Sequence, residues 1–349
     1  MTRKGLSALA TAIVLGAAVF VAPAASAEDF YKNKTFRFIV GFSPGGGYDT
    51  YTRLIARYFG KYVPGNPTTL VQNMTGAGSL ISANYIGRRA KPDGLSGAVF
   101  NNSLIVQSAL GDKKAGAVPF DKMEWAGAPS RGEIVCMMMA FSGKTTWKDV
   151  INSKEPIKIG ATRAGSTGHD IPVILNKAMG TKFKLITGYR GTATIRLALE
   201  SREVDGFCSQ WESMRVTARS MLDAEGEQKL VPFIIDSHSY PDPEIQNIPL
   251  FKDVLNKEAL ALYNSWAFQM AFQRMLALPP GTPKDRVKIL QTAYEKTLKD
   301  PQLLAEAKKS KILITPVSGA EVEKLVDGII NMPQSVRESL SFLVRQSSK

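Results

Sequence analysis

The sequence predicts an α/β protein with two domains. Short apolar strands alternate with helix-period segments along most of the chain, which is typical of largely parallel sheets. The chain is also longer than one hydrophobic core usually serves. Two glycine-rich loops, 43–49 and 165–169, each follow a strand and precede a helix. Each loop therefore indicates its own βα unit, one in each domain.

The elements follow from hydrophobic period and turn signals. In the first series we expect strands at 36–42, 69–71 and 98–100, with a helix after the first and another at about 80–89. In the second series we expect strands at 134–141, 157–160, 183–186 and 204–208, and a helix at 192–201. Residues 231–249 read as a loop-rich stretch. The last third reads as helical, with helix starts at 282–285, at Asp300-Pro301 and at a capping box, Ser318 to Glu321.

The N-terminus has the pattern of a secretory signal peptide. Arg3 and Lys4 precede an apolar stretch at 6–22, and Ala25-Ser26-Ala27 matches a small-residue cleavage site. An uncleaved anchor is the alternative, but the apolar stretch is short for a membrane span. We expect export to the periplasm and cleavage after Ala27; removing 27 of the 349 residues leaves a mature chain of 322.

The charge distribution limits the kinds of molecule that the protein is expected to bind, and the two cysteines bear on whether it contains a disulfide. The chain has 44 basic and 31 acidic residues, but the basic ones are spread along it and not clustered with aromatic residues. This distribution argues against nucleic-acid binding and leaves attraction of anionic solutes, or solubility alone. Cys136 and Cys208 lie in apolar, strand-like runs, where an exported protein could hold either a disulfide or two buried thiols. The sequence slightly favours free thiols.

Both glycine-rich loops have features that are typical of an anion-binding site. Gly45, Gly46 and Gly47 allow a ligand to approach the backbone, and the helix that follows would aim free N–H groups at it. The second loop adds the hydroxyls of Ser166 and Thr167 to such a helix start. The plainer alternative is that the glycines only make tight strand–helix turns. Two such loops in one chain favour a ligand held between two domains.

Other chemistries fit poorly. Neither loop is followed by the Gly-Lys-Ser/Thr of a P-loop, and Ile81 stands where the dinucleotide fingerprint needs its third glycine. The two histidines, His169 and His238, have no zinc-type spacing to cysteines. We therefore expect no cofactor, no metal and no catalysis, with a hydrolase using Ser166 as a less favoured reading. Asp49 would repel a bound carboxylate, so we expect it to accept backbone N–H groups at its helix start, or to orient a bridging water.

At these residues the chain resembles the periplasmic solute receptors of tripartite tricarboxylate transporters, the TctC or Bug family. The shared motifs run in order along nearly the whole mature chain: Tyr31-Lys32-Asn33-Lys34, Ser43–Asp49, Thr75-Gly76-Ala77-Gly78, Ala90–Gly94, Gly165–His169, Gly188–Ala193 and Pro279–Pro283. Each motif is weak alone, and the ordered set is specific.

The resemblance implies a two-lobed periplasmic-binding-protein type II fold, with two Rossmann-like domains joined by crossover strands around a ligand cleft. It implies a first lobe at 28–130, a second at 131–230 and a return to the first at 231–349. In the family the two loops pinch a ligand carboxylate, partly through ordered waters. Carried over to this sequence, the ligand-binding residues are Ser43, Gly45, Gly46, Gly47, Tyr48, Asp49, Gly76, Gly78, Ser79, Asn101, Gly165, Ser166, Thr167, Gly168, His169, Arg190, Gly191 and Thr192.

Two positions depart from the family pattern. Tyr48 stands where threonine is common, and it could close the pocket or stack on an aromatic acid. Arg190 stands where lysine is common, and it could hold a distal carboxylate or lie on the surface. The resemblance implies a monomeric receptor that delivers a di- or tricarboxylate, or another carboxylate-bearing solute, to small and large membrane permease subunits. A receptor that triggers a signalling partner is the main alternative.

Overall fold

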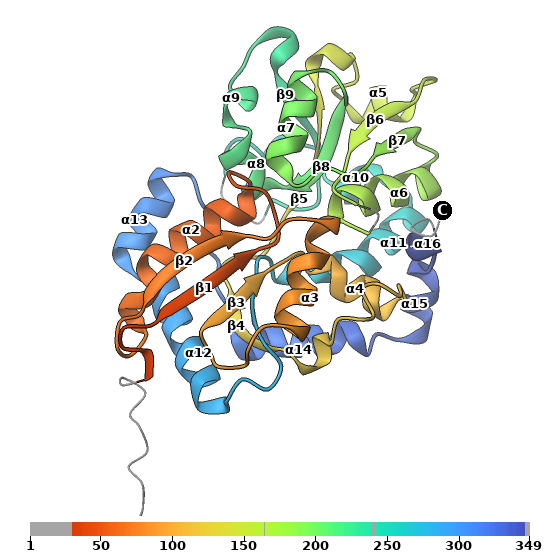
Figure 1. The fold of residues 1–349 in the computed structure, drawn as a ribbon. Coiled ribbons are helices and arrows are strands. Elements are labelled where there is room, and N and C mark those ends of the chain that lie inside the picture. Colours follow the sequence, from red (N-terminus) through yellow and green to blue (C-terminus); the bar gives the residue numbers. More distant parts are fainter. Residues whose placement is uncertain (1–29, 164, 239–241, 346–349) are drawn as a thin grey trace, which may run out of the picture.

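The computed structural model describes residues 30–163, 165–238 and 242–345. The expected signal peptide, residues 1–27, lies outside this part of the chain. The described residues form two α/β lobes, each with its own sheet, which confirms the predicted fold class (Figure 1). In the described part of the chain, no helix combines the length and apolar character that crossing a membrane requires.

The first lobe is built on a six-stranded sheet. Its strands, in spatial order, are β11 (Val317–Ser318), β4 (Glu124–Ala128), β10 (Leu276–Leu278), β3 (Ser96–Val99), β1 (Thr35–Val40) and β2 (Thr68–Asn73). β1 is parallel to both of its neighbours, whereas β10 is antiparallel to β3 and β4. β1 and β3 therefore end at the same edge of the sheet, where open α/β sheets bind ligands.

The second lobe is built on a five-stranded sheet. Its spatial order is β7 (Phe183–Ile186), β6 (Ile157–Gly160), β8 (Gly206–Gln210), β5 (Ile134–Met139) and β9 (Leu230–Ile235). β6 is parallel to β7 and β8, and β5 is antiparallel to β8 and β9. The residues of β5 are all buried, which explains why this strand reads as one continuous apolar run.

Helices cover both faces of the first sheet. Because side chains alternate along a strand, Phe38 and Val40 of β1 enter one core cluster and Ile39 enters the other. The helices labelled in the described part of the chain are α2 (Gly47–Phe59), α3 (Leu80–Arg88), α4 (Ser103–Ala109), α5 (Trp147–Ile151), α6 (Thr167–Met179), α7 (Thr192–Glu200), α8 (Trp211–Thr217), α9 (Arg219–Leu222), α10 (Phe251–Val254), α11 (Lys257–Ala267), α12 (Lys284–Leu298), α13 (Pro301–Lys309), α14 (Gly319–Ile330), α15 (Gln334–Leu340) and α16 (Phe342–Arg345). Short 3₁₀ segments lie between some of the elements: η1 (Gly60–Tyr62), η2 (Ala77–Ser79), η3 (Phe120–Lys122), η4 (Ala140–Ser142), η5 (Gly226–Gln228) and η6 (Phe268–Ala271).

The predicted helix starts are correct for α12, α13 and α14. Asp300 caps α13 by accepting from the N–H groups of Gln302 and Leu303. Ser318 caps α14 by accepting from the N–H of Glu321. The carboxylate of Glu321 bonds instead to Arg131, 2.9 Å away. The expected capping box is therefore an ordinary N-cap, with its acidic member used in an ion pair.

The chain changes lobe at other places than the sequence led us to expect. β9 pairs with β5, and Tyr263 and Trp266 of α11 belong to the second-lobe core, although residues 231–349 were assigned to the first lobe. Leu340 and Leu343 of the last two helices also pack there. The chain crosses back near 271–275, since Phe272 and Met275 lie in a first-lobe core cluster.

Residues 231–249, which we expected to be rich in loops, begin within strand β9 (Leu230–Ile235). The position of Pro232 explains why a strand is possible there. Pro232 is in β9, the edge strand of the second sheet, opposite Met137. The β5–β9 register shifts between Cys136 and Met137. An edge strand or an irregular register tolerates proline, because no ladder N–H is needed there.

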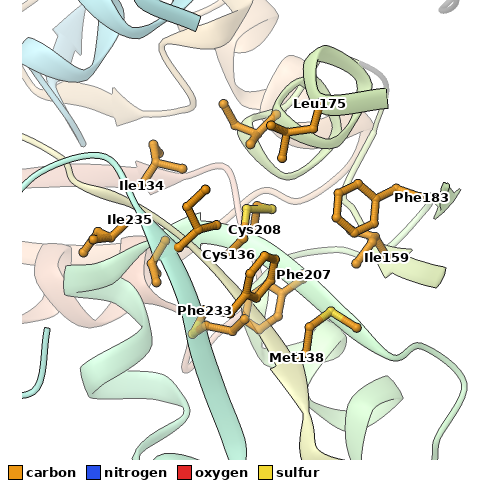
Figure 2. Packing of buried hydrophobic residues seen from close by; sticks show 14 of the residues in the cluster. Ile134, Cys136, Met138, Ile159, Leu175, Phe183, Phe207, Cys208, Phe233 and Ile235 are labelled. Atoms are coloured by element: carbon orange, nitrogen blue, oxygen red, sulfur yellow. A yellow bond between two sulfur atoms is a disulfide. The ribbon is translucent and has the colours of Figure 1, made fainter. Parts of the chain in front are cut away.

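Cys136 and Cys208 form a disulfide, so the expectation of free thiols is wrong (Figure 2). The two residues are directly opposite each other on the antiparallel strands β5 and β8, and their Cα atoms are 4.0 Å apart. Their separation of 72 residues in the sequence gives no sign of this pairing. Strand order and register bring the two sulfurs together within the core of the second lobe.

Candidate ligand-binding site

One cavity lies between the lobes, where the ends of β1 and β3 face the ends of β6 and β8. It offers about 50 Å³ to the centres of water-sized molecules. The first lobe contributes Phe42, Gly46, Gly47, Tyr48 and Asn101, and the second contributes Ala161, Thr162, Ser166, Thr167, Gly168, Thr192, Ile195, Phe207, Cys208, Ser209, Gln210 and Ser213. Both predicted glycine loops therefore meet at a single cavity.

The start of α2 forms one wall. Gly45 has φ +75°, a left-handed conformation that glycine adopts without strain, and it turns the chain into the helix. Gly46 is the N-cap residue, and no side chain caps the helix. The first N–H groups of a helix have no partner within it, so those of Gly47 and Tyr48 remain available to a ligand.

The start of α6 forms the opposite wall in the same manner. Gly165 has φ +83°. The N-cap residue Ser166 leaves the helix uncapped, because its hydroxyl donates to the carbonyl of Arg163, 2.8 Å away. The N–H groups of Thr167 and Gly168 therefore also border the cavity without a capping partner.

A third helix start borders the cavity at Thr192. Gly191 is the N-cap residue of α7 and provides no side-chain cap. Three helix dipoles thus direct their positive ends toward one small volume, each worth about 0.3–1 kcal/mol toward an anion and up to ~2 when partly buried. The arrangement suits one carboxylate or similar head group.

No lysine, arginine, histidine or acidic side chain is among the described residues that line the cavity. The predicted cation, Arg190, is exposed, and its carbonyl accepts a hydrogen bond from the N–H of Ser43. The surface alternative for Arg190 therefore matches the structure. The described lining therefore offers an anion only helix-start N–H groups and hydroxyls.

Asp49 stabilises the first loop from the side away from the cavity. Its carboxylate accepts from the N–H of Gly45 at 2.9 Å, from Asn73 at 2.8 Å and from Arg53. Burial raises the pKa of Asp49, but these hydrogen bonds from Arg53, Gly45 and Asn73 together lower it below its usual value. The expected acceptor role at the helix start is confirmed for the Gly45 N–H.

His169 and Asp170 brace the second loop in a similar way. His169 Nδ1 lies 3.1 Å from the Asp170 carboxylate and 3.3 Å from the N–H of Gly165. The other oxygen of Asp170 accepts from the indole N–H of Trp266, 3.0 Å away. His169 is not among the cavity-lining residues. Its Nδ1 donates to the Asp170 carboxylate when it carries a proton and accepts from the Gly165 N–H when it does not, so it makes one of these bonds at a time. Either way the ring lies against the loop that presents Ser166 and Thr167.

The predicted segment around Gly76, Gly78 and Ser79 does not line the cavity but holds a lining residue in position. Ser79 has φ +73° and is fully buried. Its hydroxyl oxygen accepts from the N–H of Asn101, 2.9 Å away, and so positions a residue that does line the cavity. A side chain at Gly78 would meet Arg163 of the other lobe, with Cβ only 2.3 Å from Arg163 Cδ. Gly78 therefore permits close approach of the lobes.

Ten of the predicted residues lie outside the lining. They are Ser43, Gly45, Asp49, Gly76, Gly78, Ser79, Gly165, His169, Arg190 and Gly191. The other eight predicted residues line the cavity: Gly46, Gly47, Tyr48, Asn101, Ser166, Thr167, Gly168 and Thr192.

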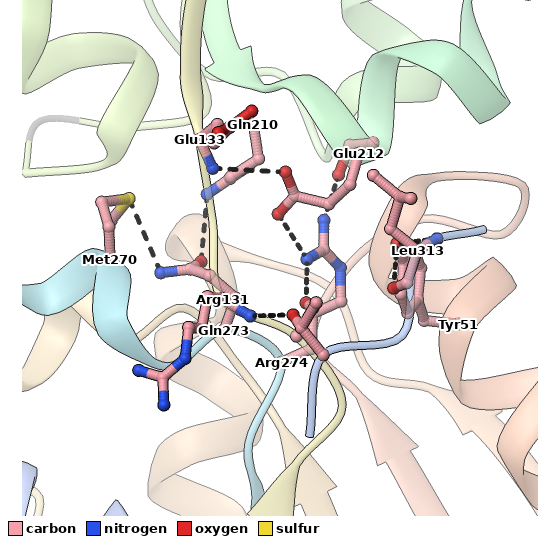
Figure 3. Close-up of polar contacts among 12 residues, drawn as sticks. Tyr51, Arg131, Glu133, Gln210, Glu212, Met270, Gln273, Arg274 and Leu313 are labelled. Carbon is pink, nitrogen blue, oxygen red and sulfur yellow. Dashed lines mark hydrogen bonds and ion pairs between the residues drawn. The ribbon is translucent and has the colours of Figure 1, made fainter. Parts of the chain in front are cut away.

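A buried polar network connects the cavity to the two segments in which the chain passes between the lobes, one around Ser130 and the other around Gln273 (Figure 3). Gln210 donates to the side chain of Gln273 at 3.2 Å and lies 3.5 Å from the Thr167 hydroxyl. Arg274 donates to Glu212 of α8 at 2.9 Å and to Ser130 at 2.9 Å. Residues 130 and 273 also form an antiparallel bridge between the two crossovers. Groups from both lobes and the crossovers are thus held in one network.

Comparison with known proteins agrees with this two-lobed arrangement. No family model matches the sequence. The UPF0065 protein in the TAR-I ttuE-ttuC' intergenic region of Agrobacterium vitis is 22% identical over 284 residues, covering 80% of this chain and 76% of that protein. The structure of the periplasmic binding protein BugD is similar with a TM-score of 0.69 at 19% identity, over 91% of this chain and 99% of its own. The fold is that of the Bug periplasmic binding proteins.

Two further solved structures share the Bug fold. MatC from Rhodopseudomonas palustris, with bound malate, has a TM-score of 0.68 at 20% identity and covers 88% of this chain and 99% of its own. Another R. palustris protein, with adipate, has a TM-score of 0.70 at 17% identity and covers 88% and 97%. The resemblance found in the sequence is confirmed at the level of the fold.

Within the Bug fold of this chain, several polar lining residues were not predicted. Ser209 and Gln210 end β8, and Ser213 follows in α8. Their place after a parallel strand of the second series was the available signal, because ligands bind beyond the carboxyl ends of such strands. Without a motif at these residues, strand order was needed to show that β8 ends beside the second glycine loop.

Proposed function

We propose that this protein is a periplasmic solute-binding protein that captures a carboxylate-bearing solute between its lobes. The observation that carries the proposal is the convergence of three uncapped helix starts, from both lobes, on one cavity. In the proposed complex the N–H groups of Gly47 and Thr167 hold the carboxylate. Two structures of the same fold contain carboxylates, malate in one and adipate in the other.

The finer part of the proposal concerns delivery. The captured acid passes to the small and large membrane subunits of a tripartite tricarboxylate transporter, and the receptor works as a monomer. Deleting the gene should abolish uptake of the radiolabelled acid. Normal uptake combined with a lost transcriptional response to the acid would favour the sensor alternative.

The geometry does not favour hydrolysis. The Ser166 hydroxyl donates to the Arg163 carbonyl, and His169 Nδ1 faces Asp170 and the Gly165 N–H. Among the described residues, no hydrogen bond joins the Ser166 hydroxyl to the imidazole ring of His169. A general base within hydrogen-bond reach of the nucleophile is what acyl transfer by a serine requires.

The test is a thermal-shift screen of the purified protein against organic acids, followed by calorimetry. A ligand at 100 times its Kd stabilises by about 2.7 kcal/mol, so a binding acid raises the Tm measurably. If no organic acid stabilises the protein, the proposal is wrong.

A matched pair of variants links binding to the helix start. Ser166→Asp places a capping carboxylate at the N-cap of α6, where it competes with a ligand for the N–H groups and repels it. Ser166→Asn can cap in the same way without the charge. We expect the aspartate variant to lose binding far more completely than the asparagine variant, although both remain folded. Equal binding by the two would contradict an anion at this position.

A further inference from the structure

We infer that this chain docks on its membrane partner through the outer edge of β2 and the groove between β2 and α3, and that the docking segment of the partner is an extended strand with apolar and acidic side chains. This inference rests on the proposed function, which assigns delivery of the captured acid to membrane subunits. It adds the surface of the receptor that those subunits recognise, and this surface lies outside the ligand cavity.

β2 is an edge strand without the usual protection against pairing. Four strands, β11, β2, β7 and β9, lie at the edges of the two described sheets (Figure 1). β11 has only two residues, β7 contains Lys184 and β9 contains Pro232, and each of these features discourages pairing with another chain. β2 has six residues, of which none is charged or proline, and its register with β1 runs without a shift. It therefore offers a regular edge to which an added strand can bond.

The backbone of β2 presents hydrogen-bonding groups at this edge. The N–H of Thr68 donates to the Lys34 carbonyl. The N–H of Met74 donates to the Val40 carbonyl, so the even-numbered residues bond toward β1. Successive residues of a strand point their backbone groups to opposite sides, so the odd-numbered residues of β2 point theirs away from β1. These residues are Thr69, Val71 and Asn73. Because β2 is the last strand of its sheet, a strand of another protein can bond to these groups.

The face of β2 that continues into the groove is apolar and uncovered. Met74, Ile81 and Tyr85 line the groove between the end of β2 and α3. Side chains alternate along a strand, so Leu70 points to the same face as Met74. Leu70 is 50% exposed and Ile81 is 48% exposed, and they are two of the four exposed large hydrophobic side chains in the described part of the chain. A partner that covers them removes apolar surface from water.

Cationic side chains border this apolar surface. Arg88 and Arg89 line the groove, and the described lining includes no acidic side chain. Arg37 is exposed and lies directly opposite Leu70 in the register of β1 and β2. A partner with acidic side chains complements these three positive charges, whereas a basic partner is repelled. The open edge, the apolar face and the charge therefore define one kind of partner segment.

The first test separates docking from ligand binding. Leu70→Glu and Arg88→Glu should each lower uptake of radiolabelled malate, or of the acid that the thermal-shift screen selects, by about tenfold in a deletion strain that carries the variant gene. Calorimetry on the purified variants should give the wild-type Kd. Leu197→Glu is the control, because Leu197 is 54% exposed but lies in α7 of the second lobe.

The outcomes of this test distinguish the two proposals. Normal uptake by the Leu70→Glu and Arg88→Glu variants, at wild-type amounts of exported protein, would overturn the inference and leave the proposed function standing. A wild-type protein that binds no acid, or whose gene does not restore uptake to the deletion strain, would instead overturn the proposed function.

The second test concerns the backbone edge. Thr69→Pro and Thr69→Val both remove the hydroxyl that donates to the Ala56 carbonyl, but only proline removes the N–H at the free edge. An edge position of this kind tolerates proline, so both variants should fold, as circular dichroism and the Tm establish. Thr69→Pro should lower uptake by about tenfold relative to Thr69→Val. Equal uptake by the two folded variants would contradict strand addition at β2.

The third test identifies the occupant. A photoreactive phenylalanine derivative incorporated at Leu70 should crosslink to a membrane subunit when cells are irradiated, whereas the same derivative at Leu197 should not. Crosslinking at Leu70 to a second copy of this chain, with a dimer in light scattering that Leu70→Glu dissociates, would show self-association at this edge. That result would overturn the inference.

Discussion

Gly47 and Ser213 meet across the two lobes with no room for a side chain at residue 47. An added Cβ would lie 2.3 Å from Ser213 Oγ and 3.2 Å from Ser213 Cα. Similar close approaches join Gly165 to Gln107 and Gly191 to Ser43. Gly47, which lines the cavity, and Gly165 and Gly191, which precede two of the helix starts beside it, therefore allow the two lobes to approach closely.

We expect Gly47→Ala to hold the lobes apart. The methyl group clashes with Cβ and Oγ of Ser213 in α8, so the closed form becomes less populated. The apparent affinity falls, by about tenfold if one-tenth of the molecules remain competent to close. Small-angle scattering should show a larger radius of gyration, and calorimetry the weaker binding. The control is Gly328→Ala in α14, where an added Cβ meets nothing within 4 Å. A compact Gly47→Ala variant with normal affinity would contradict this account.

Asp49→Asn should reduce the stability of the first loop. Loss of the charged acceptor for Gly45, Asn73 and Arg53 costs about 1–2 kcal/mol, mostly from the buried bonds, because the Arg53 side chain is 45% exposed and its ion pair contributes little. We also expect a moderate change in affinity. Urea unfolding and calorimetry measure the two effects; lost stability with unchanged affinity would make Asp49 purely structural.

The same variant has a defined pH dependence. The pKa of Asp49 is lower in the folded protein, so its stabilisation is complete above the unfolded pKa, near 3.9, and is lost as pH falls through the folded pKa. The difference in free energy of unfolding between wild type and Asp49→Asn should therefore be constant from pH 5 to 7 and shrink below about pH 4. A difference that grows on acidification would contradict the assignment.

Arg274→Met should be strongly destabilising. It leaves Glu212 buried without its cation, which typically costs about 3–5 kcal/mol. Burial raises the pKa of Glu212, and Arg274 opposes that rise. Without Arg274 the folded pKa rises further, so the deficit should grow as pH increases toward 7. The double variant with Glu212→Leu should recover stability in urea unfolding; an additive double variant would exclude coupling between the pair.

Reduction of the Cys136–Cys208 disulfide should destabilise the second lobe. The crosslink joins residues 72 apart, and loss of such a bond typically costs about 2–5 kcal/mol. Urea unfolding of the Cys136→Ala/Cys208→Ala protein, with and without reductant, measures the effect. The variant should be indifferent to reductant, whereas the wild type should lose stability. Equal stability of the oxidised and reduced wild type would contradict a structural role.

Local patterns were sufficient where a few adjacent residues decide the outcome. The strand-loop-helix units at Gly45–Gly47 and Gly165–Gly168 form as predicted, because glycine conformation and helix starts depend on neighbours in the sequence. The same is true of the Asp300 cap. The disulfide, β9 and the return of α15 to the second lobe were not predicted, because they depend on strand order and packing between distant segments.

By itself the sequence determined that there would be two α/β units, each presenting a glycine-rich helix start, since period and turn chemistry are local properties. Only the tertiary structure decided that both starts border one cavity, that the described lining of this cavity has no cationic side chain, and that Arg190 is exposed. The physical reason is that the charge and shape of a cleft are set by which side chains two lobes bring together, and those contacts join residues far apart in the chain.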